Sequence, residues 1–94
     1  MDYNKAIQFF SIEKDSHILF NRGLAKGRMS DYRGSILDLN KAIELTPDYG
    51  LAYMLRGDAK LEIGKMDDAC LDWSKAGELG VTQAYDKIKL NCNK

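Results

Sequence analysis

The residues with the richest chemistry in this chain of 94 residues are two cysteines, Cys70 and Cys92, and a single histidine, His17. Thiolates and imidazoles bind metals and act as nucleophiles or bases. The cysteines lack metal-site spacing, and neither has a histidine nearby. With a single histidine, the chain shows no recognisable Cys-His or Ser-His-Asp catalytic arrangement. It also has no phosphate-binding or dinucleotide-binding glycine motif. We therefore predict no catalytic residues, no metal and no cofactor, with a thiol-based enzyme as the weakest alternative.

A second group of chemically distinctive residues consists of charges that recur along the chain. Arg22 recurs as Arg56 and Asp38 recurs as Asp72, at the same offset in the sequence. A cation and an anion that recur together favour an ion pair between helices over a ligand contact. Such a pair contributes little where it is exposed and is costly to break where it is buried.

Shifting the sequence by the offset from Arg22 to Arg56 also aligns other distinctive residues with identical ones. Three further dipeptides return unchanged, namely Ala25-Lys26 as Ala59-Lys60, Leu37-Asp38 as Leu71-Asp72, and Lys41-Ala42 as Lys75-Ala76. A period of about 34 residues with a helix–turn–helix pattern is the signature of the tetratricopeptide repeat (TPR). The chain has this period, and it resembles that family well over residues 16–83 and loosely at both ends.

The resemblance extends to the family's characteristic positions, which are a large residue in fourth place, small residues in eighth and twentieth, an aromatic in twenty-fourth, alanine in twenty-seventh and proline in thirty-second. The first repeat offers Leu19, Gly23, Ser35, Leu39, Ala42 and Pro47, and the second offers Tyr53, Gly57, Ala69, Trp73, Ala76 and Val81. The departures are Ser35, Leu39, Val81, and the lysines Lys26 and Lys60 in eleventh place, where an aromatic is usual.

Glycines in mid-helix cost about 0.5–1 kcal/mol relative to alanine. A helix tolerates Gly23 and Gly57 where another backbone must come close. We expect the small residues Ser35 and Ala69 to lie opposite them.

The resemblance implies an all-α fold, a right-handed superhelical TPR solenoid of antiparallel helix pairs with about six helices in one domain. We divide the chain into an N-terminal helix that is a half repeat or cap (1–15), repeat 1 (16–49), repeat 2 (50–83) and a C-terminal capping helix (84–94). On that last helix Ala84 and Ile88 face inward, whereas Lys87 and Asn91 belong to its polar side.

The N-terminal segment carries an apolar stripe at helical spacing, formed by Tyr3, Ala6, Ile7 and Phe10. Asp2-Tyr3 with Ala6 echoes Asp31-Tyr32 with Ser35, so this segment resembles the second helix of a repeat. The distance along the sequence from Tyr3 to Tyr32 is smaller than the repeat period from Arg22 to Arg56. The junction that joins this segment to repeat 1 is therefore shorter than the junction between the two repeats.

That short junction contains neither glycine nor proline, and only Asp15-Ser16 offers a helix cap. We prefer two helices joined by a tight turn near Asp15. The alternative is one continuous helix from Tyr3 to Arg28, which exposes the apolar stripe and invites exchange of this segment between two copies.

In the TPR family the first helices of successive repeats line a concave binding groove. The corresponding positions here are His17, Phe20, Leu24, Gly27, Arg28, Leu51, Met54, Asp58, Leu61 and Glu62. Five of them are large and apolar, and together on a surface they would form a patch of the kind that marks interaction sites. We predict a peptide or protein partner in this groove; the alternative is that the terminal helices cover part of it.

Some family members clamp the carboxylate end of chaperone peptides with a basic, asparagine-rich groove. Asn21 matches one such position, but Leu51 and Leu55 stand where cations are needed. The resemblance therefore disfavours this binding mode.

Composition excludes other partners. Fourteen basic and fourteen acidic residues give a formal net charge of zero, whereas phosphate-binding domains carry a basic excess. No apolar run approaches a membrane span, and no signal peptide is visible. We predict neither nucleic acid nor membrane insertion. The structural alternative is a self-association module, which is either a homodimer or part of a longer TPR array.

Cys70 lies early in the second helix of its repeat and Cys92 at the end of the final helix. Antiparallel packing brings these two ends level, so a disulfide is geometrically allowed. Buried free thiols are the common alternative.

Overall fold

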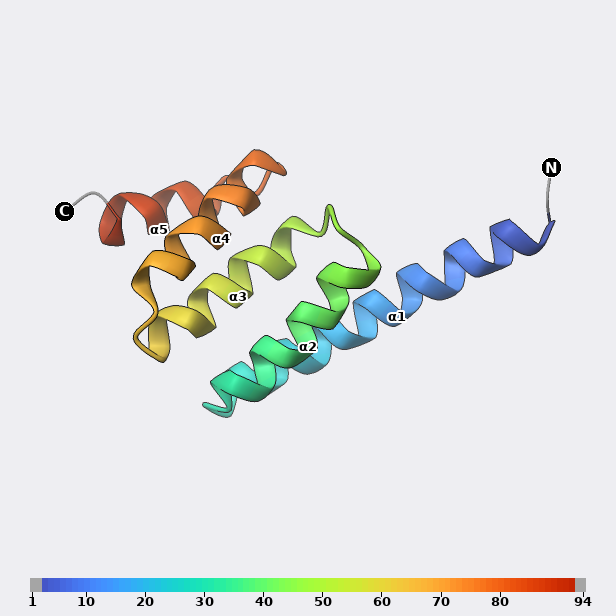
Figure 1. Cartoon of the computed structure of the whole chain (residues 1–94), viewed down its shortest axis with the longest axis horizontal. Helices are drawn as coiled ribbons and strands as arrows, with labels where there is room; N and C mark the ends of the chain where they lie inside the picture. Colours follow the sequence, from blue (N-terminus) through green and yellow to red (C-terminus); the bar gives the residue numbers. More distant parts are fainter. Residues whose placement is uncertain (1–2, 93–94) are drawn as a thin grey trace.

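The computed structural model describes the backbone of residues 3–92 and the side chains of residues 11–92. Over the described backbone the chain forms five helices and no strand (Figure 1). They are α1 (Tyr3–Arg28), α2 (Tyr32–Leu45), α3 (Gly50–Glu62), α4 (Met66–Glu78) and α5 (Gln83–Asn91). The all-α prediction is confirmed, and the expectation of six helices is wrong. None of these helices is long and apolar enough to cross a membrane.

The missing sixth helix is explained by α1, which runs without a break through the predicted turn at Asp15. The later junction, between α2 and α3, has a turn of four residues, namely Thr46, Pro47, Asp48 and Tyr49. The N-terminal junction is shorter than this one by about the length of that turn, so no residues remain for a turn and the helix continues. The side chains of the predicted apolar stripe lie outside the described residues, and the division into repeats stays a prediction.

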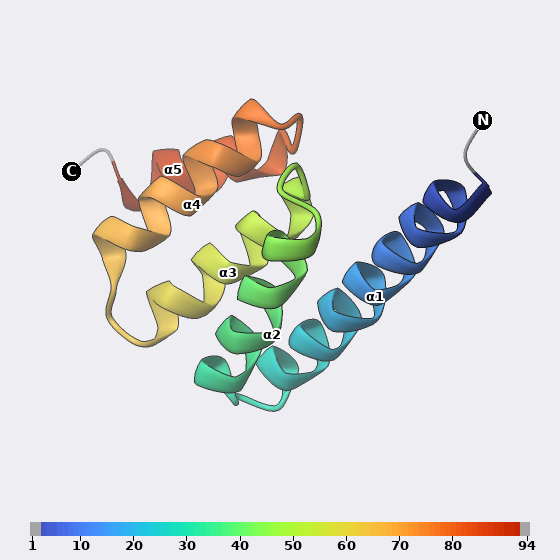
Figure 2. The same ribbon diagram turned by 45° about the vertical axis from the view of Figure 1, so that its right-hand side comes forward.

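Short connections set the order of the helices. Asp31 caps α2, because its Oδ1 accepts a hydrogen bond from the Gly34 amide at 3.0 Å. Gly64 and Gly80 follow α3 and α4 with φ of 83° and 98°, a left-handed conformation that glycine adopts without steric cost. Successive helices therefore reverse direction and pack beside one another (Figures 1 and 2).

The two mid-helix glycines mark where paired helices come closest. A Cβ atom on Gly23 would lie 3.0 Å from Leu39 Cγ and 3.3 Å from the Ser35 carbonyl oxygen. One on Gly57 would lie 2.6 Å from Trp73 Nε1 and 3.1 Å from the Ala69 oxygen. The predicted approach of backbones is confirmed, and the twenty-fourth residue of each repeat, Leu39 or Trp73, fills the space that the glycine leaves.

The predicted ion pairs between helices are also confirmed. Arg22 Nη2 and Nε donate to Asp38 at 2.7 and 2.8 Å, and Arg56 repeats this arrangement on Asp72 at 2.7 and 2.9 Å. A lysine joins each pair, because Lys26 Nζ lies 3.1 Å from Asp38 and Lys60 Nζ lies 3.1 Å from Asp72.

These clusters account for the lysines found in place of the family's aromatic residue. Both aspartates are buried, so each needs its cations. The hydrogen bond from Arg22 is the largest cause that lowers the pKa of Asp38, and the same bond raises the pKa of Arg22.

Candidate protein-binding site

A hollow of about 390 Å³ opens where α1, α3 and α5 face one another. We call it the central hollow. It is lined by Gly23, Leu24, Gly27 and Arg28 of α1, Tyr32 and Ser35 of α2, Leu55, Asp58, Ala59, Leu61 and Glu62 of α3, Trp73 of α4, and Lys87 and Asn91 of α5. Helices α1 and α3 supply most of this lining, as the TPR resemblance implies.

The predicted groove residues divide between two places. Leu24, Gly27, Arg28, Asp58, Leu61 and Glu62 line the central hollow. His17 and Leu51 instead line a second hollow of about 420 Å³, beside the linker between α2 and α3. Phe20 and Met54 line neither of these hollows.

Phe20 and Met54 are held by other contacts. The Phe20 ring stacks on Tyr49 with centroids 5.0 Å apart and planes at 21°, so it packs on the linker. Met54 packs against the buried cluster around Trp73. These contacts leave Phe20 and Met54 partly buried, and the other groove positions line two separate hollows, so the groove itself stays a prediction.

The second hollow is polar where it meets the linker. His17 Nδ1 lies 3.4 Å from the Tyr49 hydroxyl, and the buried Ser16 hydroxyl shares a hydrogen bond with Thr46. Burial raises the pKa of Tyr49. These contacts fasten α1 to the linker, while His17 itself stays exposed.

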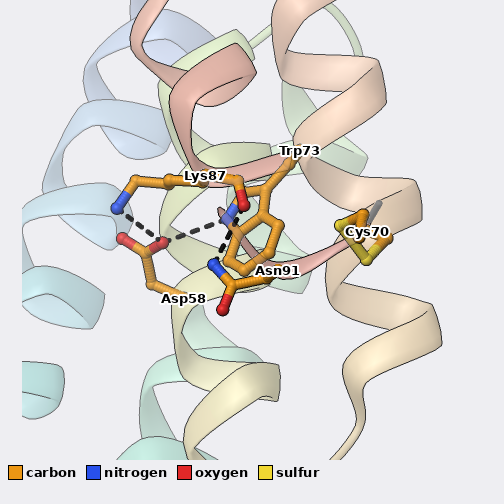
Figure 3. The surroundings of a disulfide bond; sticks show 6 residues. Asp58, Cys70, Trp73, Lys87 and Asn91 are labelled. Carbon is orange, nitrogen blue, oxygen red and sulfur yellow. Dashed lines mark hydrogen bonds and ion pairs between the residues drawn. A yellow bond between two sulfur atoms is a disulfide. The ribbon is translucent and has the colours of Figure 1, made fainter. Parts of the chain in front are cut away.

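Asp58 ties three helices together in the wall of the central hollow (Figure 3). Its Oδ1 accepts a hydrogen bond from Trp73 Nε1 at 3.0 Å and lies 3.1 Å from Lys87 Nζ. The indole of Trp73 is 1% exposed, and a buried N–H group needs such an acceptor. Lys87 compensates the charge of Asp58, so the wall presents a neutral pair.

Two residues of this site were placed elsewhere by the sequence analysis. Lys87 and Asn91 were assigned to the polar side of the last helix, yet both line the central hollow. Asn91 Nδ2 also donates to the Lys87 carbonyl oxygen at 2.9 Å. Their spacing of one helical turn shows that they share a helix face, but only the packing of α5 decides that this face meets the hollow. Ala84 and Ile88 do pack inward, as predicted.

Helix α5 is fastened to α4 by a disulfide. In the structure Cys70 of α4 is bonded to Cys92, the residue after α5, with Cα atoms 6.0 Å apart. Figure 3 shows this bond on the side of Trp73 away from Asp58 and Lys87. The disulfide and the Asp58–Lys87 pair therefore hold α5 from two sides. Among the described residues no group of three His, Cys, Asp or Glu side chains could hold a metal ion.

Comparison with known proteins finds relatives among heat shock proteins. The chain is 30% identical over 96 aligned positions to heat shock protein STI1 of Saccharomyces cerevisiae, covering 96% of this chain and 16% of that protein. It is 32% identical over 73 positions to a heat shock protein sti1 homolog of Schizosaccharomyces pombe, covering 72% of this chain and 12% of that protein. No family model matches the chain. The chain thus resembles a segment of these proteins and spans less than a fifth of their length.

Proposed function

We propose that this chain is a TPR module, a short right-handed superhelical stack, that binds a peptide segment of a partner protein in the central hollow. Binding without catalysis is part of the proposal. The observation that supports it most strongly is the position of the hollow on α1 and α3, the helices that form the binding groove in the family that the sequence resembles.

The size and lining of the hollow suit side chains of a peptide. Its volume of about 390 Å³ lies within the range of roughly 300–1,000 Å³ typical of ligand pockets. Leu24, Leu55 and Leu61 supply apolar surface and are only partly buried. One or two large apolar side chains of the partner would fill this space, with the rest of the peptide lying across the surface.

The charges around the hollow favour a partner of mixed charge. Arg28 and Glu62 are exposed and carry opposite charges, while Asp58 and Lys87 neutralise each other. A partner segment with an apolar anchor between one acidic and one basic residue matches this rim. The similarity to segments of two heat shock proteins supports a role among such proteins without naming a partner.

The test is a selection from a random-peptide phage library, followed by calorimetric titration of the chosen peptides. Leu24→Asp places a charge in the hollow and is expected to weaken binding by about tenfold or more. Leu37→Asp is the matched control, because Leu37 lies on α2 outside the hollow and is 69% exposed. Circular dichroism establishes that both variants keep their helices.

Two results would overturn the proposal. One is a selection that enriches no peptide. The other is equal affinity of the unchanged chain and Leu24→Asp for every selected peptide.

A further inference from the structure

The chain presents one helix surface twice, once covered and once open. Three positions of α1 correspond, one repeat period later, to three positions of α3, and these pairs are Ile18 and Ala52, Arg22 and Arg56, and Ala25 and Ala59. Within each helix the three residues lie four and three apart, so they share one face. We call the α1 set, Ile18, Arg22 and Ala25, the outer face of α1.

On α3 this surface is closed by a neighbouring helix. Ala52 is 0% exposed and Ala59 is 4% exposed. Arg56, between them, donates from Nη1 to Asn40 Oδ1 of α2 at 3.0 Å, so α2 covers this face. The interface between α2 and α3 therefore shows what kind of element the surface accepts, namely a helix with a polar acceptor opposite the arginine.

On α1 the same surface is open to solvent. Ile18 is 53% exposed, and Ala25 is also exposed. Arg22 holds Asp38 as Arg56 holds Asp72, but its side chain is 59% exposed compared with 18% for Arg56. Among the residues whose side chains are described, no acceptor meets Arg22 in the way that Asn40 meets Arg56.

The chain also contains a second segment of the type that covers α3. Residues 3–14 resemble α2 at the shorter offset noted above, with Tyr3 matching Tyr32 and Ser11 matching Asn40. The hydroxyl of Ser11 would thus stand where Asn40 stands, as a hydrogen-bond acceptor for an arginine.

This segment cannot reach the outer face of its own α1. Helix α1 has 26 residues and is therefore about 39 Å long, and residues 3–14 form its straight N-terminal part. Figure 2 shows this part extending beyond α2, with no other helix beside it. A segment in line with a helix cannot also pack against that helix, so residues 3–14 can cover this face only on the α1 of another molecule.

We propose that the outer face of α1 is a dimer interface that accepts residues 3–14 of a second copy of this chain. The second copy receives the same segment in return, which gives a two-fold symmetric exchange with identical contacts on both sides. Ser11 of each copy then lies opposite Arg22 of the other, and Ile18 and Ala25 are buried as Ala52 and Ala59 are.

The exchange is tested by restoring the missing turn. A copy of residues 45–49 (Leu-Thr-Pro-Asp-Tyr) is inserted between Asp15 and Ser16. The N-terminal junction then has the same length as the junction between the two repeats. Residues 3–14 of this variant can fold back onto their own α1. Light scattering after size exclusion, over a wide range of concentrations, is expected to show a dimer for the unchanged chain and a monomer for the insertion variant.

A point variant tests the face itself. Ile18→Asp is expected to raise the dimer dissociation constant by about tenfold or more, because it places a charge in the proposed interface. Leu71→Asp, on the exposed side of α4, is the control and is expected to leave the dimer intact. A monomer at every concentration of the unchanged chain overturns the proposal, and so does an insertion variant or an Ile18→Asp variant that dimerises as the unchanged chain does.

Discussion

Trp73 donates its indole hydrogen to the carboxylate of Asp58, with Nε1 and Oδ1 3.0 Å apart, and Lys87 reaches the same oxygen at 3.1 Å. One atom in the wall of the central hollow thereby joins α3, α4 and α5. Because Trp73 is the only tryptophan in the chain, its fluorescence reports on the core and on the hollow together.

The first prediction concerns this shared carboxylate. Asp58→Ala is expected to lower the free energy of unfolding by about 1–3 kcal/mol, because it leaves the buried indole N–H without an acceptor. Asp58→Asn keeps an oxygen for Trp73 and loses only the pairing with the partly exposed Lys87, so its loss is expected to be smaller. Urea unfolding followed by circular dichroism measures both. Equal losses in the two variants would show that the indole hydrogen bond does not contribute as described.

The period of the repeat was enough to predict which residues meet between paired helices. Once the register is known, the small residue in twentieth place is expected opposite the glycine in eighth place, and the twenty-third residue opposite the seventh. Gly57 against Ala69 and Arg56 against Asp72 are examples. These contacts are local to one helix pair, so their prediction needed no knowledge of how the pairs are arranged in space.

Two features could not be predicted in this way. The continuity of α1 depends on the absence of a turn, and a short junction without glycine or proline fits both a tight turn and an unbroken helix. The place of Lys87 depends on how α5 packs against α3 and α4, and the polar character of a terminal helix face does not reveal what lies beside it. The place of Lys87 is set by tertiary packing, whereas the local sequence at Asp15 leaves both the turn and the unbroken helix open.

The second prediction concerns the disulfide between Cys70 and Cys92. Reduction with an excess of a dithiol is expected to lower the free energy of unfolding by roughly 2–4 kcal/mol, because it releases the constraint on the unfolded chain. Hydrogen exchange should rise most in α5, which the bond fastens to α4. Thermal unfolding with and without reductant measures the change.

The control for this experiment is the double variant Cys70→Ser and Cys92→Ser. It should unfold at the same temperature with or without the dithiol, and close to that of the reduced chain. If the unfolding temperature of the unchanged chain is also the same with and without the dithiol, the disulfide does not stabilise the fold.

The third prediction follows from the cluster around Asp38. Its pKa in the folded chain lies below the ordinary value of 3.8, chiefly because of the hydrogen bond from Arg22. A group whose pKa is depressed by folding stabilises the protein above its unfolded pKa, and this contribution is lost as the pH falls through its folded pKa. The free energy of unfolding should therefore decline as the pH is lowered from about 5 towards 2.

Asp38→Asn removes the titrating group, so its free energy of unfolding should decline less steeply over the same pH range. The difference between the unchanged chain and this variant is expected to be largest near neutral pH and to shrink in acid. Asp48→Asn is the matched control, because Asp48 is exposed and should leave the slope unchanged. Chemical unfolding at a series of pH values measures these slopes, and parallel curves for the unchanged chain and Asp38→Asn would remove the ion pair as the source of the acid sensitivity.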